Sequence, residues 1–323
     1  MESNNTVYHA CWGFSVPQEN ASTNFTDIYV VGNKVYDHST WNGTSGCHAN
    51  ALHIYQGSAC TTCTVTGFYM IDNEFDGPVS STDTTSQIYT DQNGGNTTII
   101  NGYYLNNVLS IENGDCSGTC DGLFTHANGS PSYIYNNTIT CNATATTQQT
   151  SGIQTYVLTG LDARNNVVVN CQMAMQSKGS TWSSSTNYNY YGNSGFGFGS
   201  SSDAACCISF ATWQSDSGAD ANSVSNSATS GILPACNSGT DCSNLQPASG
   251  SPVIGFGQNL YSLAGCSSPV VPGLGSLCTD KAGNVSTSVK FGELPVVNLY
   301  ALLTVSQFVA LGPCCFCTLI VRP

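Results

Sequence analysis

The sequence predicts an all-β solenoid, in which successive coils of chain stack on one another. Three observations support this fold class. Charged residues make up only 8% of the 323 residues, and the polar content comes from Asn, Ser, Thr and Gly, which favour strands and turns over helix interiors. No long stretch has the apolar spacing of an amphipathic helix. A strand motif that contains Asn recurs along the chain at intervals typical of solenoid repeats.

The recurring motif places an Asn among apolar and β-branched residues. It occurs at Asn33, Asn73, Asn107, Asn137, Asn166 and Asn193, at intervals of 40, 34, 30, 29 and 27 residues. A second strand precedes the motif in each unit, as in residues 51–57 and 151–160. One unit is therefore predicted to be strand, turn, strand, turn. Each strand would pair with its equivalent in the neighbouring coil, about 4.8 Å away.

Stacking of this kind explains why Asn lies within a strand motif. Equivalent Asn residues would lie directly over one another, and each amide would donate to the carbonyl of its neighbour. Asn also tolerates the left-handed backbone conformation that a sharp corner needs. We therefore predict a column of hydrogen-bonded amides along the solenoid.

The paired strands with "NNTI" corners, as in residues 136–139, resemble the right-handed parallel β-helix repeats of the pectate-lyase-like superfamily. The resemblance covers residues 24–200. Residues 213–224, 250–260 and 279–283 are similar to the closing segments of secreted β-helix proteins. The resemblance implies a right-handed parallel β-helix of about six or more coils, with an irregular C-terminal segment. We expect this domain to cover residues 1–289, with the closing segment starting at about residue 203.

The seventeen cysteines favour an oxidising compartment, and thus a secreted or cell-surface protein. Cys141 and Cys171 are 30 residues apart, which is one coil length, so they could lie on neighbouring coils and bond. Cys60 and Cys63 have the spacing of zinc ligands, but no second pair completes a tetrahedral site. Nine N-x-S/T motifs are potential glycosylation sites in an exported protein. No secretory signal pattern is present, so we expect the native start to lie upstream.

Residues 290–323 form an apolar C-terminal tail, within which residues 299–321 make a 23-residue stretch long enough to span a bilayer. One interpretation is a membrane anchor or sorting tail. The alternative, a segment not native to the domain, is favoured because the closing strand expected from the resemblance is missing.

The charge balance restricts the partners. Six basic residues face nineteen acidic residues, for a net charge of −13. A nucleic-acid partner needs a basic stripe to meet its phosphates, and none is present. A polyanion would need a bridging divalent cation, whereas a neutral polysaccharide or cell-surface glycan carries no such penalty.

The strands upstream of the Asn motif suggest a ligand face. If Leu52, Ile88, Leu123, Ile153 and Met173 point inward, their alternates point outward. One outward column is then His53, Tyr89, Phe124 and Gln154, and the other is Tyr55, Asp91, His126 and Tyr156. The candidate substrate-binding residues are His53, Tyr55, Tyr89, Phe124 and Tyr156, because aromatic rings stack on sugars.

Two sets of candidate catalytic residues follow. Asp91 and His126 would lie on successive coils, where the carboxylate could orient the imidazole as a general base. The resemblance implies Arg164, since polysaccharide lyases with this fold use Arg or Lys as base beside calcium-binding Asp residues. Calcium is the cofactor that this resemblance allows. The acidic cluster Asp72, Glu74 and Asp76 lies three coils from Arg164, about 14 Å, which is too far for one site.

Two functions remain open from the sequence. One is a secreted or surface protein that binds an extended polysaccharide along its outer strands, and that cleaves it if the protein is a lyase or glycoside hydrolase. The sequence matches the lyase "IDH" signature only loosely, at residues 35–40, and lacks the Asp motifs of β-helix hydrolases. The alternative is a non-catalytic structural or adhesin-like surface module, in which the aromatic columns only stabilise the strands. Membrane contact is expected only if the tail is an anchor.

Overall fold

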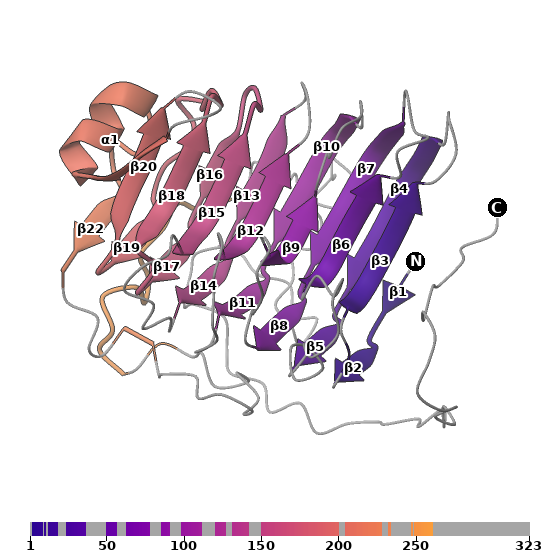
Figure 1. Cartoon of the computed structure of the whole chain (residues 1–323). Coiled ribbons are helices and arrows are strands. Elements are labelled where there is room, and N and C mark those ends of the chain that lie inside the picture. The colour runs from indigo at the N-terminus through magenta and orange to yellow at the C-terminus, as the bar shows by residue number, and fades with distance from the viewer. Residues whose placement is uncertain are drawn as a thin grey trace.

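The structure is a computed structural model of the chain. It describes residues 2–8, 10, 12–18, 24–36, 50–56, 63–77, 85–90, 98–111, 120–126, 131–141, 150–199, 204–227, 232–233, 247 and 249–260. These residues form a right-handed parallel β-helix of about seven coils (Figure 1). The predicted fold class is confirmed.

Each full coil contributes one strand to each of three sheets, which we call sheets A, B and C. Sheet A contains β1 (Glu2–Ser3), β4 (Asn24–Val31), β7 (Thr64–Ile71), β10 (Thr98–Leu105), β13 (Ser132–Tyr135) and β16 (Asp162–Arg164). Sheet B contains β2 (Thr6–Tyr8), β5 (Lys34–Tyr36), β8 (Glu74–Gly77), β11 (Val108–Ile111), β14 (Thr138–Cys141), β17 (Val167–Val169), β19 (Tyr190–Gly192) and β22 (Val224–Asn226).

Sheet C contains β3 (Trp12–Gln18), β6 (Asn50–Gln56), β9 (Thr85–Thr90), β12 (Cys120–His126), β15 (Thr150–Tyr156), β18 (Met173–Lys178), β20 (Gly195–Gly199) and β21 (Ala204–Ile208). Strand pairs along the stack are parallel, as between β12 and β15. The pair of β20 with β21 is antiparallel and lies at the C-terminal end of sheet C.

The prediction of two strands per coil was wrong, because the Asn motif spans two strands. In the first motif β4 ends at Val31 and β5 begins at Lys34. Gly32, between them, has a left-handed backbone with φ +66°. The equivalent positions are Asp72, Asn106, Asn136 and Asn165, each with φ +57°. The left-handed residue turns the chain from sheet A into sheet B, so the motif is a corner and not a continuous strand.

The predicted amide column is confirmed for Asn33, Asn73, Asn107, Asn137 and Asn166. In each, the Nδ2 amide donates to the Oδ1 of the next Asn at 2.9–3.1 Å. The backbone N–H donates to the same oxygen at 2.9–3.1 Å. The second Nδ2 hydrogen goes to a backbone carbonyl, for example from Asn107 to Met70 at 3.0 Å. Buried amides are thereby satisfied by one another and by the backbone.

The two ends of this Asn ladder differ from the prediction. The ladder begins at Asn5, which donates to Asn33 Oδ1. It continues from Asn166 to Asn189 and not to Asn193. Asn193 follows β19, whereas Asn189 precedes it. The interval from Asn166 to Asn189 is only 23 residues, shorter than the earlier intervals. Asn193 fits the same sequence pattern, so the sequence analysis selected it in place of Asn189.

The core lies between the three sheets. Leu52, Ile88, Leu123 and Ile153 are buried register partners, as predicted. The fifth predicted member was wrong, since Ile153 pairs with Met175, whereas Met173 pairs with Ser151. Strand side chains alternate with a period of two, so a shift of two residues preserves the inward pattern, and the sequence could not distinguish the two registers.

Helix α1 (Phe210–Ser217) closes the C-terminal end of the core, at the orange end of the stack in Figure 1. The hydroxyl of Ser209 caps its first turn, and Gly218 ends it with a left-handed backbone. Trp213 is fully buried, and its ring packs 5.6 Å from the ring of Phe196, measured between centroids. The helix therefore covers apolar side chains that the last coil would otherwise expose.

The predicted disulfide between Cys141 and Cys171 is confirmed, with a Cα–Cα distance of 4.7 Å. It joins neighbouring coils of sheet B. Cys63, Cys120 and Cys207 are also disulfide-bonded, so Cys63 is not a free thiolate for zinc, and Cys60 lies outside the described residues. These bonds indicate an oxidising, extracellular environment.

The apolar tail, residues 290–323, also lies outside the described residues. Within the part of the chain that is described, no helix is both long and apolar enough to cross a membrane.

Candidate functional site on the outer face of sheet C

The first predicted outward column is formed in the structure. His53 on β6 pairs with Tyr89 on β9, which pairs with Phe124 on β12. The ring centroids of His53 and Tyr89 are 5.0 Å apart, and those of Tyr89 and Phe124 are 4.8 Å apart. Trp12 on β3 packs edge-on against His53. We call these four side chains the ring file.

The ring file is less accessible than predicted. His53, Tyr89 and Phe124 are only 3%, 9% and 6% exposed. They do not belong to the core cluster, so they lie on the other face of the sheet. Successive rings cover one another's faces and edges, which removes much of their surface from water. A ligand therefore has little direct access to these three side chains.

The second predicted column is more open. His126 on β12 pairs with Tyr156 on β15, and their ring centroids are 4.2 Å apart. Lys178 on β18 pairs with Tyr156 and extends the column by one coil. All three side chains are half-buried. We call His126, Tyr156 and Lys178 the open file.

Two members of this column fall outside what the structure describes. The backbone of Tyr55 lies in β6, opposite Pro17 of β3, but its side chain is not described. Asp91 lies outside the described residues altogether. The hypothesis of an Asp91–His126 pair therefore stays a prediction.

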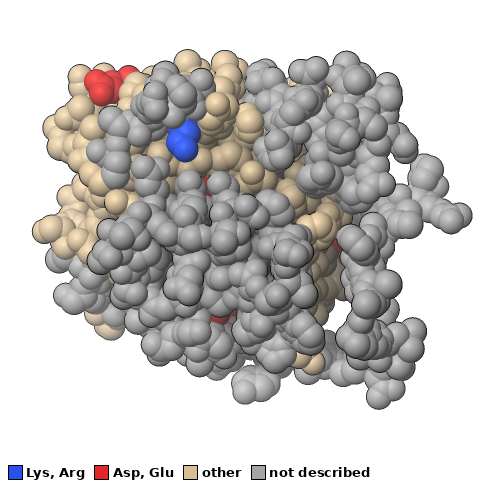
Figure 2. All heavy atoms as spheres, viewed as in Figure 1, with Lys and Arg blue, Asp and Glu red and all other residues tan. Residues whose placement is uncertain are grey.

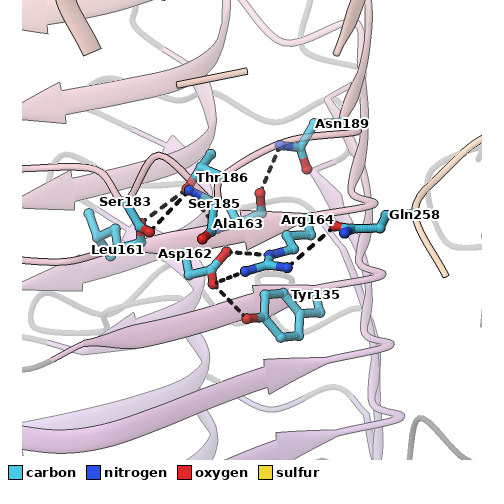
Figure 3. Close-up of polar contacts among 10 residues, drawn as sticks. All are labelled: Tyr135, Leu161, Asp162, Ala163, Arg164, Ser183, Ser185, Thr186, Asn189 and Gln258. Carbon is cyan, nitrogen blue, oxygen red and sulfur yellow. Dashed lines mark hydrogen bonds and ion pairs between the residues drawn. The ribbon is translucent and has the colours of Figure 1, made fainter. Parts of the chain in front are cut away.

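Arg164 lies on β16 of sheet A, on a different sheet from His126. Figure 3 shows Arg164 with its partners Asp162 and Gln258. Its Nε donates to Asp162 Oδ1 at 2.8 Å, and its Nη2 donates to Asp162 Oδ2 at 2.7 Å. Its Nη1 donates to Gln258 Oε1 at 3.3 Å. The hydroxyl of Tyr135 donates to the same Asp162 carboxylate at 2.9 Å. The structure therefore does not bring Arg164 together with His126.

The surroundings of Arg164 suit a structural clamp better than a base. Burial acts to lower the pKa of its guanidinium, but hydrogen bonding to Asp162 and the charge of that carboxylate hold the pKa above its ordinary value. The group stays protonated and cannot accept a proton. Through Gln258 it ties residues 251–260 to the coil that contains β16.

The acidic cluster on the β7–β8 corner offers no described metal centre. Asp72 is the left-handed corner residue, Asp76 is buried, and Glu74 forms an ion pair with Lys34 at 3.4 Å. Among the described side chains, no group of three His, Cys, Asp or Glu residues could hold a metal ion. The calcium expectation thus has no described site to support it.

The sequence reasoning placed Gln154 on the outer face of sheet C but missed the polar patch to which it belongs, beside the ring file. The patch consists of Ser86, Asp121, Ser151, Gln154 and Gln176, all nearly fully buried. Asp121 pairs in register with Ser86 and Ser151. Ser86 Oγ donates to Asp121 Oδ2 at 3.3 Å, and Ser151 Oγ donates to Gln176 Oε1 at 3.1 Å.

Asp121 is the chemically distinctive member of the polar patch. Burial raises its pKa to about 8, although Lys178, Ser151 and Ser86 act to lower it. The carboxyl group therefore holds its proton at neutral pH. Its Oδ1 has no hydrogen-bond partner among the residues that the structure describes.

Strict inward–outward alternation counted from Leu123 would place Asp121 inward, so the sequence analysis did not identify the patch. A Cβ at Gly122 would lie 2.5 Å from Ile139 Cγ2 in the core. Residue 122 therefore faces inward together with Leu123, and the alternation breaks just after Asp121. The glycine itself, in the middle of a strand, was the signal that could have indicated such an irregularity.

No protein-family model, no curated protein and no solved structure matches this chain. The chain is a parallel β-helix protein. That statement rests on its strand order and on its buried Asn ladder.

Proposed function

We propose that this protein is a secreted or surface β-helix that binds an extended polysaccharide along the outer face of sheet C. The observation that carries the proposal is the open file. His126, Tyr156 and Lys178 form a continuous half-buried column across three coils. An extended chain that ran along the axis of the helix would meet one of these side chains at each coil, at intervals of about 4.8 Å.

The chemistry of the open file suits a sugar chain. Rings present apolar faces to the C–H groups of pyranose rings, and imidazole, phenol and ammonium groups bind hydroxyls. The net charge of −13 disfavours an acidic polysaccharide. Few charged side chains lie among the described residues on the face that Figure 2 shows. We therefore propose a neutral polysaccharide or cell-surface glycan as the ligand.

The proposal is limited to binding. Cleavage of a glycosidic bond in most hydrolases needs two carboxyl groups on either side of it. Asp121 is a proton-holding carboxyl on this sheet, but Arg164 lies on sheet A and Asp91 lies outside the described residues. The resemblance of the sequence repeats to those of the pectate-lyase-like superfamily is one reason for proposing a polysaccharide as the ligand.

One observation favours the alternative of a non-catalytic structural module. The ring file is buried, as expected for aromatic residues whose purpose is to hold coils together. In that case the open file would be only the solvent-facing margin of the same structural ladder.

A glycan array with neutral polysaccharides separates the two functions. We expect Tyr156→Ala to weaken binding by roughly ten-fold, because it removes one stacking ring. Tyr8→Ala is the matched control, since Tyr8 is an exposed tyrosine on sheet B, and we expect it to leave binding unchanged. No binding across the array would contradict the proposal and favour the structural module. Release of unsaturated sugar ends, followed by ultraviolet absorbance, would add lyase activity to it.

A further inference from the structure

Four stacked tyrosines run along the outer face of sheet A. Tyr29 on β4, Tyr69 on β7, Tyr103 on β10 and Tyr133 on β13 are register partners in successive coils. They belong to a side-chain cluster separate from the core. Their ring centroids are 4.4, 4.9 and 5.0 Å apart, and successive ring planes lie within 13° of parallel. We call these four side chains the tyrosine file, and its neighbouring π systems are in contact along its whole length.

The middle of the tyrosine file is shielded, whereas its two ends are partly open. Tyr69 and Tyr103 are each only 4% exposed, and Tyr29 and Tyr133 are half-buried. Burial, with a contribution from the phenols of Tyr133 and Tyr69, raises the pKa of the Tyr103 hydroxyl. A reagent in solution therefore meets the end rings first, and the phenols in the middle keep their protons at neutral pH.

Tyr69 differs from Tyr103 because a carboxylate lies beside its hydroxyl. Burial, followed by the charges and hydrogen bonds of Tyr29 and Asp27, raises the pKa of the Tyr69 hydroxyl to about 12. Gly67 leaves the space for this contact, since a Cβ there would lie 2.6 Å from Asp27 Oδ1 and 3.1 Å from Tyr69 Oη. The hydroxyl of Tyr69 thus has an acceptor for its proton in Asp27, which is itself exposed to water.

The carboxylate at the other end of the file is already engaged. Asp162 pairs in register with Tyr133, but it accepts hydrogen bonds from Tyr135 and from Arg164. The positive guanidinium of Arg164 opposes protonation of the carboxylate that it contacts. Asp27 is therefore a better proton acceptor than Asp162.

Stacking alone does not explain why all four positions carry tyrosine. The ring file of sheet C also stacks, but its four members are of four different residue types, so this fold accepts various rings at stacked positions. Beyond the ring, tyrosines share a phenol, and a phenol loses an electron far more readily than the ring of phenylalanine. The oxidised phenol is a strong acid, so this loss at neutral pH needs a nearby base.

We propose that the tyrosine file is a one-electron redox centre, in which the end rings of Tyr29 and Tyr133 pass oxidising equivalents to the shielded ring of Tyr69. A one-electron oxidant takes one electron from the file, the O–H bond of Tyr69 breaks, and the proton moves to the Asp27 carboxylate. The products are a neutral tyrosyl radical at Tyr69, a neutral Asp27 and the reduced oxidant. The substrates are soluble one-electron oxidants, such as phenoxyl radicals. This centre is independent of polysaccharide binding on sheet C.

The shielding of Tyr69 gives the radical a measurable property. Radicals on exposed tyrosines meet one another in solution and couple, whereas a radical on a ring that is 4% exposed does not. We use photo-oxidised ruthenium tris(bipyridine), with persulfate as electron acceptor, as the probe oxidant on the full chain. We expect transient absorption and electron paramagnetic resonance to show a tyrosyl fraction that survives roughly ten times longer than the rest, because packed neighbours keep other radicals away.

Variants of the file identify where the long-lived radical resides. Tyr69→Phe should abolish the long-lived fraction, because Phe keeps the stacked ring but has no phenol. Asp27→Asn should lower its yield by roughly five-fold, because an amide does not take up the proton. Tyr29→Phe combined with Tyr133→Phe should lower the yield to a similar degree, since both entry rings are lost. Circular dichroism verifies the fold of each variant.

Tyr190→Phe is the matched control. Tyr190 is a buried tyrosine, 2% exposed, on β19 of sheet B and outside the tyrosine file, so we expect this variant to behave like the wild type. The proposal would be overturned by a wild type without a long-lived fraction, or by an unchanged fraction in Tyr69→Phe. Equal loss in Tyr69→Phe and Tyr190→Phe would also overturn it, since the radical would then not be specific to the file.

Discussion

At the scale of single residues, two of the buried carboxyl groups, those of Asp220 and Asp121, have different surroundings. Asp220 accepts four hydrogen bonds. Its Oδ1 accepts from Asn189 Nδ2 and Ser223 Oγ, and its Oδ2 accepts from Trp213 Nε1 at 2.8 Å and Tyr191 Oη at 3.0 Å. The four donors oppose the effect of burial, which raises its pKa. Asp220 therefore joins the end of the Asn ladder to α1.

Asp121 has fewer partners, and its protonation should make stability depend on pH. Its folded-state pKa is about 8, whereas its ordinary value is 3.8. Between these values the folded state binds more protons than the unfolded state, so stability falls as pH rises towards 8. The Asn side chain does not titrate, so the Asp121→Asn variant should not lose stability in this way as pH rises.

We therefore expect the unfolding free energy of the wild type, relative to that of Asp121→Asn, to fall by up to about 1.4 kcal/mol per pH unit between about pH 5 and pH 7. Urea unfolding of both proteins across this range measures it. Asp216→Asn is the control, because Asp216 is exposed. Parallel pH profiles for wild type and Asp121→Asn would show that Asp121 is ionised in the folded protein.

At the scale of elements, the corner between sheets A and B divides two tasks between adjacent residues. Asn136 takes the left-handed conformation, with φ +57°. Asn137 carries the ladder, since its Oδ1 accepts two donors from Asn107 and its Nδ2 donates to Asn166 Oδ1 and to the carbonyl of Tyr104. The sequence "NN" therefore contains one backbone device and one hydrogen-bonding device.

The same substitution at these two positions should change the free energy of unfolding by very different amounts. Asn136→Gly should change stability by no more than about 0.5 kcal/mol, because glycine adopts the left-handed conformation without strain, and Gly32 already occupies this position in another coil. Asn137→Gly should cost roughly 3–5 kcal/mol, because it leaves buried donors of Asn107 without an acceptor. Denaturant unfolding gives both values, and similar costs for the two variants would contradict this division.

At the scale of the whole molecule, the stack behaves as a one-dimensional array in which each coil contacts its neighbours. The end layers then decide where opening starts. Trp213 of α1 packs against Trp182 and Phe196 and is fully buried. Together with Phe210, which packs against Tyr191 and Phe196, it forms apolar contacts between the helix and the last coils.

Trp213→Ala should open the C-terminal end before the rest of the stack. Loss of a fully buried Trp costs about 3–5 kcal/mol, and nearest-neighbour coupling confines much of that loss to the adjacent coils. Hydrogen exchange should become faster in β19 and β20 while β7 and β10 remain protected. Uniform acceleration along all coils would show instead that the β-helix unfolds as one cooperative unit.

The sequence by itself determined the fold class and five rungs of the Asn ladder, and its spacing indicated that Cys141 and Cys171 could bond. These features repeat at nearly constant intervals, so a local pattern is enough to identify them. It also ordered His53, Tyr89 and Phe124 of the ring file correctly, because alternation within a strand is local too. Asp91 and the tail lie outside the described residues, so the expectations about them stay predictions.

Only the tertiary structure decided how the repeats end and where polar groups meet. The last rung is Asn189 because a shortened interval replaced the expected one. Arg164 became a clamp because Gln258, 94 residues away, reached it. Asp121 joined a buried patch because the chain bends inward at Gly122. Such contacts depend on segments far apart in sequence and on single breaks in periodicity, and a repeating pattern carries no information about either.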